Sequence, residues 1–156
     1  MGENELPAWE EDRVAYKLIA GEACNRRSGV PVYSRLHMLE IKSKTRQKIS
    51  IGGHLYGESG LYLLEGGIES EGHEYGAKQM LVTKDSHLCE FIIQLNSSLY
   101  IFGGEPFPEE RFIDWNFVST DKGLIDKAKQ DWKAQEFDKI MGDETEFIPY
   151  PTFPKR

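Results

Sequence analysis

The sequence predicts an all-β sandwich or barrel followed by one helix. Between residue 13 and about residue 104, short runs rich in β-branched and aromatic residues are separated by glycine-rich breaks. No helical pattern interrupts these runs, which argues against alternating strands and helices. Helical spacing of apolar residues begins only near residue 121. The chain of 156 residues is therefore predicted to form a single domain, residues 1–156, with its barrel at about 13–104.

The strands are predicted from the spacing of apolar residues. Apolar and polar side chains alternate at 47–51, a pattern typical of a strand with one buried face. Residues 61–64 form a continuous apolar run, which indicates a strand covered on both faces. Glycine pairs such as Gly52-Gly53 and Gly66-Gly67 supply the turns. The predicted strands span residues 13–19, 37–42, 47–51, 61–64, 79–82, 89–93 and 98–102.

A helix is predicted at residues 121 to about 138. Ser119, Thr120 or Asp121 can cap its N-terminus. Its predicted apolar stripe consists of Leu124, Ile125, Ala128 and Trp132. Beyond Gly142, three prolines favour an extended tail over residues 142–156.

Charge and cysteine content limit the classes of function. The chain has 26 acidic and 19 basic residues, a net charge of -7, which argues against general nucleic-acid binding and against binding to anionic membranes. The acidic N-terminus lacks the apolar segment of a signal peptide, and no apolar run approaches the ~20 residues of a membrane span. The two cysteines, Cys24 and Cys89, indicate reduced thiols and a cytoplasmic protein, with a disulfide between them as the alternative.

Several short stretches resemble the C-terminal half of pirin-like proteins, which are members of the cupin superfamily. They are Leu6-Pro7-Ala8-Trp9, Gly103-Gly104-Glu105-Pro106, Trp115-Asn116-Phe117-Val118-Ser119 and Glu146-Phe147-Ile148-Pro149. The resemblance implies a cupin-type double-stranded β-helix, a jelly-roll barrel, with one C-terminal α-helix packed outside. We expect Trp115 and Phe117 to hold that helix against the barrel.

The same resemblance implies a protein without catalytic metal. Pirin-like proteins carry two barrels, and their iron ligands lie in the N-terminal one, so none of these ligands maps onto this chain. Their dioxygenase activity and their binding to transcription regulators belong to the iron-bearing half or to the whole protein. We therefore expect a structural, partner-binding or assembly module. Its expected partner is a protein or a second copy, since a homodimer would reproduce the two-barrel arrangement.

A partial cupin metal motif supports an alternative. Gly76 precedes His87 by the spacing of the second cupin motif, and His54 precedes Glu58 as in the first, although Gly52 replaces the leading histidine. Two imidazoles and one carboxylate can hold Fe(II) or another divalent transition metal for dioxygenase chemistry. His54, Glu58 and His87 are the candidate ligands, and solvated histidines are the simpler interpretation. A barrel that binds a small molecule without metal is a third hypothesis.

The remaining reactive side chains have structural alternatives. His37 lies among apolar residues and is interpreted as a strand histidine, while His73 is expected to be exposed at a hairpin tip. Arg26-Arg27 can bind an anion or be solvated, and their charge can lower the pKa of Cys24 and make its thiol reactive. Cys89 is interpreted as an ordinary strand residue.

Overall fold

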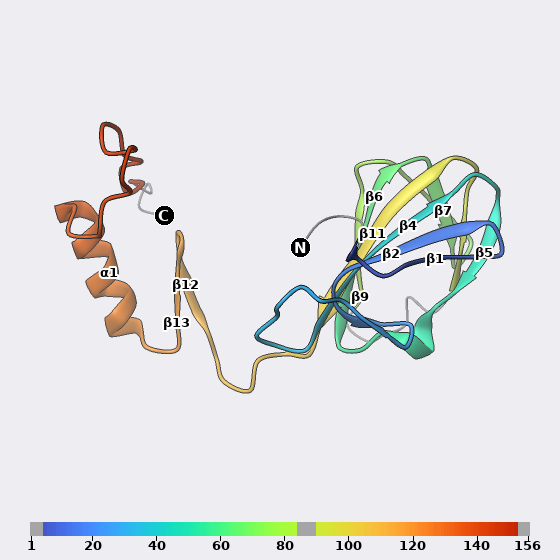
Figure 1. The fold of residues 1–156 in the computed structure, drawn as a ribbon, viewed down its shortest axis with the longest axis horizontal. Helices are drawn as coiled ribbons and strands as arrows, with labels where there is room; N and C mark the ends of the chain where they lie inside the picture. The colour runs from blue at the N-terminus through green and yellow to red at the C-terminus, as the bar shows by residue number, and fades with distance from the viewer. Residues whose placement is uncertain (1–4, 84–89, 153–156) are drawn as a thin grey trace. The chain divides into compact units, whose positions relative to one another are not determined.

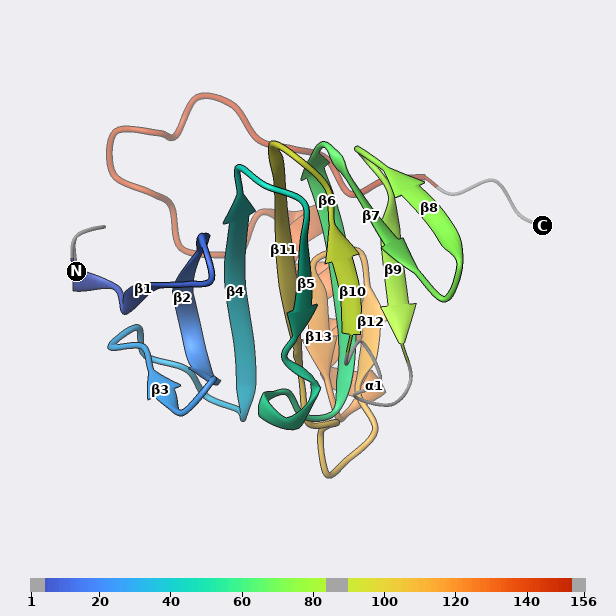
Figure 2. The same ribbon diagram turned by 90° about the vertical axis from the view of Figure 1, so that its right-hand side faces the viewer.

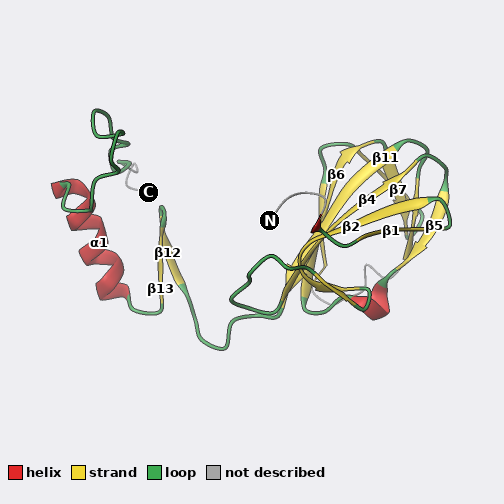
Figure 3. Ribbon diagram, in the orientation of Figure 1, coloured by secondary structure: helices red, strands yellow, loops and turns green. Residues whose placement is uncertain are grey.

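The structure, a computed structural model, describes residues 5–83 and 90–152. The chain divides into two compact units, residues 1–106 and residues 107–156. The first unit consists mainly of strands and the second contains a hairpin and a helix (Figure 3). The length of the chain predicts that the two units make up one domain, and this stays a prediction.

Two antiparallel sheets build the first unit (Figures 1 and 2). Among the described residues, the larger sheet has seven strands in the order β1-β2-β4-β11-β6-β9, with β3 beside β2. The smaller sheet has the order β5-β10-β7-β8. Their bounds are β1 Ala8–Glu11, β2 Val14–Ala23, β3 Arg26–Arg27, β4 Leu36–Ser43, β5 Gln47–Ser50, β6 Glu58–Glu65, β7 Gly67–Ser70, β8 His73–Gly76, β9 Met80–Thr83, β10 Glu90–Ile93 and β11 Ser97–Gly104.

The order of pairing defines a jelly roll. Strand β7 pairs with β8, β6 with β9, β5 with β10 and β4 with β11, each antiparallel. These nested pairs are those of one long hairpin folded over so that alternate pairs join opposite sheets. The expectation of an all-β jelly roll is confirmed.

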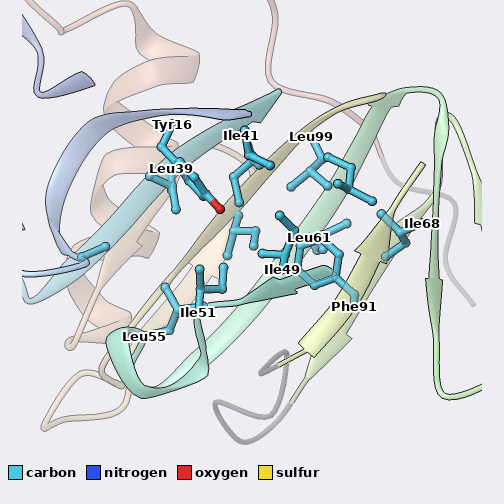
Figure 4. Close-up of a cluster of buried hydrophobic side chains, with 14 of the residues drawn as sticks. Tyr16, Leu39, Ile41, Ile49, Ile51, Leu55, Leu61, Ile68, Phe91 and Leu99 are labelled. Carbon is cyan, nitrogen blue, oxygen red and sulfur yellow. The ribbon is translucent and has the colours of Figure 1, made fainter. Parts of the chain in front are cut away.

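The core lies between the two sheets (Figure 4). Alternate side chains of β4 point inward, and both Leu39 and Ile41 are fully buried. Ile49 and Phe91 of the smaller sheet belong to the same cluster and lie near Leu61 of β6 (Figure 4). Each such side chain contributes about 1.5–3 kcal/mol on burial, so this layer supplies the main stabilisation of the unit.

The predicted strands are confirmed to within a few residues at their ends, although Cys89 lies outside the described residues. One detail of the prediction is not met within the first unit alone. The apolar run at 61–64 predicted a strand covered on both faces. Of these four residues, Leu61 and Leu63 are fully buried and the other two are not. Leu64 is 43% exposed and Tyr62 is half-buried, because the outer face of β6 has no second sheet over it among residues 5–83 and 90–106.

The second unit packs a helix on a hairpin. Strands β12, Phe112–Asp114, and β13, Phe117–Ser119, precede α1, Lys122–Ala134. Trp115 contacts Trp132 of the helix edge-to-face at 5.1 Å, and the Trp132 ring N–H donates to the Ile148 carbonyl of the tail at 2.8 Å. These contacts all lie within residues 107–156. The expectation that Trp115 and Phe117 hold the helix against the barrel therefore stays a prediction.

The predicted helix was four residues too long. It ends at Ala134 because Gln135 adopts the left-handed conformation, with φ 59°, and its N–H closes the last turn. Within the predicted stripe Ile125 is buried but Leu124 is 58% exposed. Among the described residues, no helix has the length and apolar character needed to cross a membrane.

Replacing the helix cap tests this part of the structure. The Asp121 side chain accepts a hydrogen bond from the Gly123 N–H at 2.7 Å. We expect Asp121→Ala to destabilise the helix by about 1 kcal/mol, seen as faster amide exchange through α1. Asp126→Ala removes a 3.6 Å ion pair with Lys129 in the same helix but introduces the better helix former, so it should not speed exchange. Equal effects of the two substitutions would contradict the capping role.

Candidate functional site

A cleft of about 430 Å³ opens at one end of the first unit. Its walls come from the end of β2, the turn into β3, the residue before β4 and the 3-10 helix Gly52–His54 with the segment after it. The polar side chains that line it are Glu22, Cys24, Asn25, Arg26, Arg27, Arg35, His54 and Tyr56. With three arginines against one glutamate, the lining is positive in a chain whose net charge is -7.

A tight hairpin positions two of these arginines. Cys24 and Asn25 both have positive φ, 51° and 56°, and form the two-residue turn between β2 and β3. Two positive φ values in a two-residue loop match the twist of the flanking strands. The hairpin therefore presents Arg26 and Arg27 from a short, stiff support.

Aromatic rings hold two of the guanidinium groups. The Arg26 guanidinium lies 4.1 Å from the centre of the Trp9 ring, and Trp9 stacks in turn on Tyr16. The Arg35 guanidinium lies 4.1 Å from the centre of the Tyr56 ring. Stacking fixes the plane of a guanidinium while leaving its edge N–H groups free to donate.

A buried histidine lies behind Tyr56. The ring of His37 meets that of Tyr56 edge-on at 5.1 Å, and His37 Nε2 lies 3.3 Å from the hydroxyl oxygen of Ser59. His37 is 1% exposed, and its Nδ1 has no hydrogen-bond partner among the described residues. Burial lowers the pKa of His37 to about 4, because the imidazolium form loses its hydration there. The imidazole is therefore neutral at neutral pH.

The structure places two of the three predicted metal ligands. His54 is exposed in the wall of the cleft. Glu58 is exposed at the start of β6, where its neighbour Ser59 points inward, so the Glu58 carboxylate lies on the opposite side of the sheet. His87 lies outside the described residues. No three His, Cys, Asp or Glu side chains gather into a metal-binding group within residues 5–83 and 90–152. His54 and Glu58 are two donors, fewer than the three that the predicted centre needs, and the set of His54, Glu58 and His87 stays a prediction.

The other reactive side chains are also located. His73 is exposed, as predicted. Cys24 is half-buried, and burial raises the pKa of its thiol although the charge of Arg26 lowers it. Of the two alternatives for Cys24, this favours an ordinary cysteine over a reactive thiol, because the loss of hydration outweighs the attraction of an exposed guanidinium. Cys89, and with it the alternative disulfide, lies outside the described residues.

Sequence reasoning missed Arg35, Tyr56 and Ser59 as members of this region. His37 lies two residues before Leu39 and four before Ile41, so all three side chains share one face of a strand. This spacing was a usable signal that His37 points inward. Its contact with Ser59 was not predictable, because it depends on β11 lying between β4 and β6.

The outer face of the larger sheet is a second candidate surface. One row across its strands consists of Ala20, Met38, Phe102, Gly60 and Val82. The next row consists of Lys17, Glu40, Tyr100, Tyr62 and Met80. Val82 and Met80 are 58% and 53% exposed, and the rings of Phe102 and Tyr62 are half-buried. The face is therefore apolar over β11, β6 and β9, and we call this region the apolar face.

The outer face of the smaller sheet differs in character. Lys48 pairs there with Glu90 at 2.8 Å, and Arg46 pairs with Glu69 at 2.9 Å. Ionic side chains on a strand surface are typical of contact with water. The two outer faces of the sandwich are thus unequal, one ionic and one apolar.

The nested strand pairs and the two facing sheets define a cupin-type β-sandwich. The family model of the pirin C-terminal cupin domain matches residues 38–138. The chain therefore belongs to the pirin C-terminal cupin family.

The relatives agree with this assignment. A pirin-like protein of Caulobacter vibrioides is 37% identical over 150 residues, 96% of this chain and 51% of that protein. A putative quercetin 2,3-dioxygenase of Pseudomonas aeruginosa is 28% identical over 130 residues, 83% of this chain and 41% of that protein. The crystal structure of a quercetin 2,3-dioxygenase from Acinetobacter baumannii matches 97% of this chain and 52% of its own, with a TM-score of 0.81 and 26% identity. The chain spans about half the length of the curated relatives that it matches.

Proposed function

We propose that this chain is an assembly module without catalytic metal, and that it works by pairing its apolar face with a second copy of itself. The pair would reproduce the two-cupin arrangement that the pirin resemblance implies. Each copy would supply one sandwich and would cover the exposed strands of the other. The observation that carries the proposal is the apolar face itself.

The composition of the apolar face supports burial against protein. A strand with a continuous apolar run, such as residues 61–64, is typical of a strand covered on both sides. In the first unit its outer side chains stay exposed or half-buried. Contiguous apolar surface of this kind is uncommon on monomers and is typical of interaction sites.

The packing around Gly60 makes the apolar face flat enough to contact another protein. Gly60 has no side chain, and a Cβ there would lie 3.0 Å from the end of Met80 and 3.2 Å from the Phe102 ring. Met80 and Phe102 therefore lie down over the sheet at this point. On one flank the face meets the polar Glu40, which is bonded to Tyr100 and to Lys42. An apolar centre with a polar rim is typical of protein interfaces.

Self-association gives the direct test. In light scattering at micromolar concentration we expect the mass of a dimer. Val82→Lys should weaken the dimer by about tenfold or more, since it places a desolvated charge in the contact. Leu95→Lys is the matched control, because Leu95 is 60% exposed in the turn between β10 and β11, away from the apolar face. A monomeric wild-type protein, or equal weakening by both substitutions, would contradict the proposal.

The absence of a catalytic metal is tested separately. We expect elemental analysis of protein purified without a metal-affinity tag to find no near-stoichiometric iron, nickel, copper or zinc. The reason is that His54 and Glu58 are both exposed, whereas a cupin metal is held inside the barrel. Near-stoichiometric metal that disappears in a His87→Ala variant would overturn this part of the proposal. It would favour a dioxygenase-like cupin, the activity named for two of the relatives.

A further inference from the structure

We infer that the arginine-lined cleft binds a small anion through a carboxylate or phosphate group. The cleft holds about 430 Å³ and lies at the end of the sandwich, on residues that the apolar face does not include. A volume of this order accommodates a metabolite-sized ligand rather than a peptide or a lipid surface. The inference is independent of the proposed self-association.

Arg26 is the main donor available to such a ligand. Its guanidinium is held over Trp9 and donates one hydrogen bond, from Nη1 to the Cys24 carbonyl at 3.1 Å. Among the residues that the structure describes, it forms no ion pair with a carboxylate. A guanidinium with a fixed plane and unused N–H groups binds carboxylates and phosphates through paired hydrogen bonds.

Arg27 and Arg35 add charge that a ligand can share. Arg27 meets Glu22 only at 3.4 Å, and both side chains are largely exposed, so this pair is loose and contributes little. Arg35 is held by Tyr56 and by an ion pair with Glu105. Arg27 and Arg35 thus each have a carboxylate beside them, and Arg26 is the guanidinium of the cleft that has no ion pair among the described residues. An anion bound beside Arg26 would neutralise the positive charge of its guanidinium group.

The remaining wall suits the uncharged part of a ligand. The edge of Tyr56 and the side chain of Leu55 line the cleft beside the arginines. His54, exposed in the same wall, can donate or accept a hydrogen bond. The site therefore favours a compact oxyanion over an extended polyanion, consistent with the acidic character of the whole chain.

The test uses inorganic phosphate and, in a second arm, malonate, followed by NMR of the arginine side chains at constant ionic strength. We expect saturable shifts of the Nε–H signals of Arg26, Arg27 and Arg35. Arg26→Gln should weaken binding by about tenfold, the effect of losing one paired contact. Saturation by phosphate alone, by malonate alone or by both supports the inference and assigns the preferred group.

Two further variants keep the result interpretable. Arg27→Gln changes a side chain that is 79% exposed, so the fold should tolerate it, and it should also weaken binding. Arg46→Gln removes the same charge from the smaller sheet and should leave binding unchanged. Shifts that stay linear in both probes, or equal weakening by Arg46→Gln and the two cleft variants, would overturn the inference.

Discussion

Lowering the pH from 6.5 to 4 should lower the free energy of unfolding of the first unit by about 3 kcal/mol through His37 alone. Burial holds the pKa of His37 at about 4, against 6.5 when unfolded, so the unfolded chain binds the proton more readily. The stability is therefore fully present above pH 6.5 and is lost as the pH falls toward 4. Below pH 4 both states are protonated at this group, and the loss ends.

The His37 prediction is measured by urea unfolding followed by circular dichroism across this pH range. His37→Gln removes the titrating group, so its stability should fall about 3 kcal/mol less between pH 6.5 and 4 than that of the wild type. His73→Gln is the control, because His73 is exposed and should leave the wild-type profile unchanged. The same pH profile in wild type and His37→Gln would show that His37 is not buried as described.

Replacing Gly57 with alanine should destabilise the first unit by about 3 kcal/mol. Gly57 has φ +68°, and a Cβ there would lie 1.9 Å from the Gly104 carbonyl oxygen. The substitution must therefore displace backbone at the edge of the cleft, next to Tyr56. The readout is the urea midpoint, with an unchanged slope as the sign that the unfolded chain is unaffected.

A second glycine separates the steric effect from the conformational one. Gly72 has a similar φ, +76°, but nothing lies within 4 Å of a Cβ built there. Gly72→Ala should cost only about 1 kcal/mol, the usual penalty for a side chain in this conformation. Equal losses for Gly57→Ala and Gly72→Ala would contradict the close approach of Gly57 to Gly104.

The strands with a strong apolar pattern were predictable from sequence, and the weakly patterned ones were not. Strand β4 alternates cleanly because one face meets the core and the other does not. Strand β1 has the sequence AWEE and lies at the edge of the sheet, so it carries almost no apolar signal. Strand β7 begins at Gly67 and β8 ends at Gly76, and glycine is a residue more typical of turns than of strands.

The candidate sites were less predictable because they depend on pairing between distant strands. Arg26-Arg27 were recognised as a possible anion site, but the support from Trp9 depends on β1 pairing with β2. Arg35 and Tyr56 lie 21 positions apart in sequence and meet only where β4 and β6 begin. The apolar face was not predictable for a related reason. The run at 61–64 shows that the strand is apolar on both sides, but it does not show which strands lie beside it or what covers its outer side.

The most direct test of self-association is the solvent exposure of the methionine methyl groups. Met38 and Met80 lie on the outer face of the larger sheet, while Met141 in the second unit is 93% exposed. With labelled methyl groups and a soluble paramagnetic agent, the proposal predicts that the Met80 signal is protected at high protein concentration. Protection should disappear on dilution and in Val82→Lys, while Met141 stays broadened throughout. A Met80 signal as strongly broadened as that of Met141 at every concentration would contradict the pairing of the apolar face.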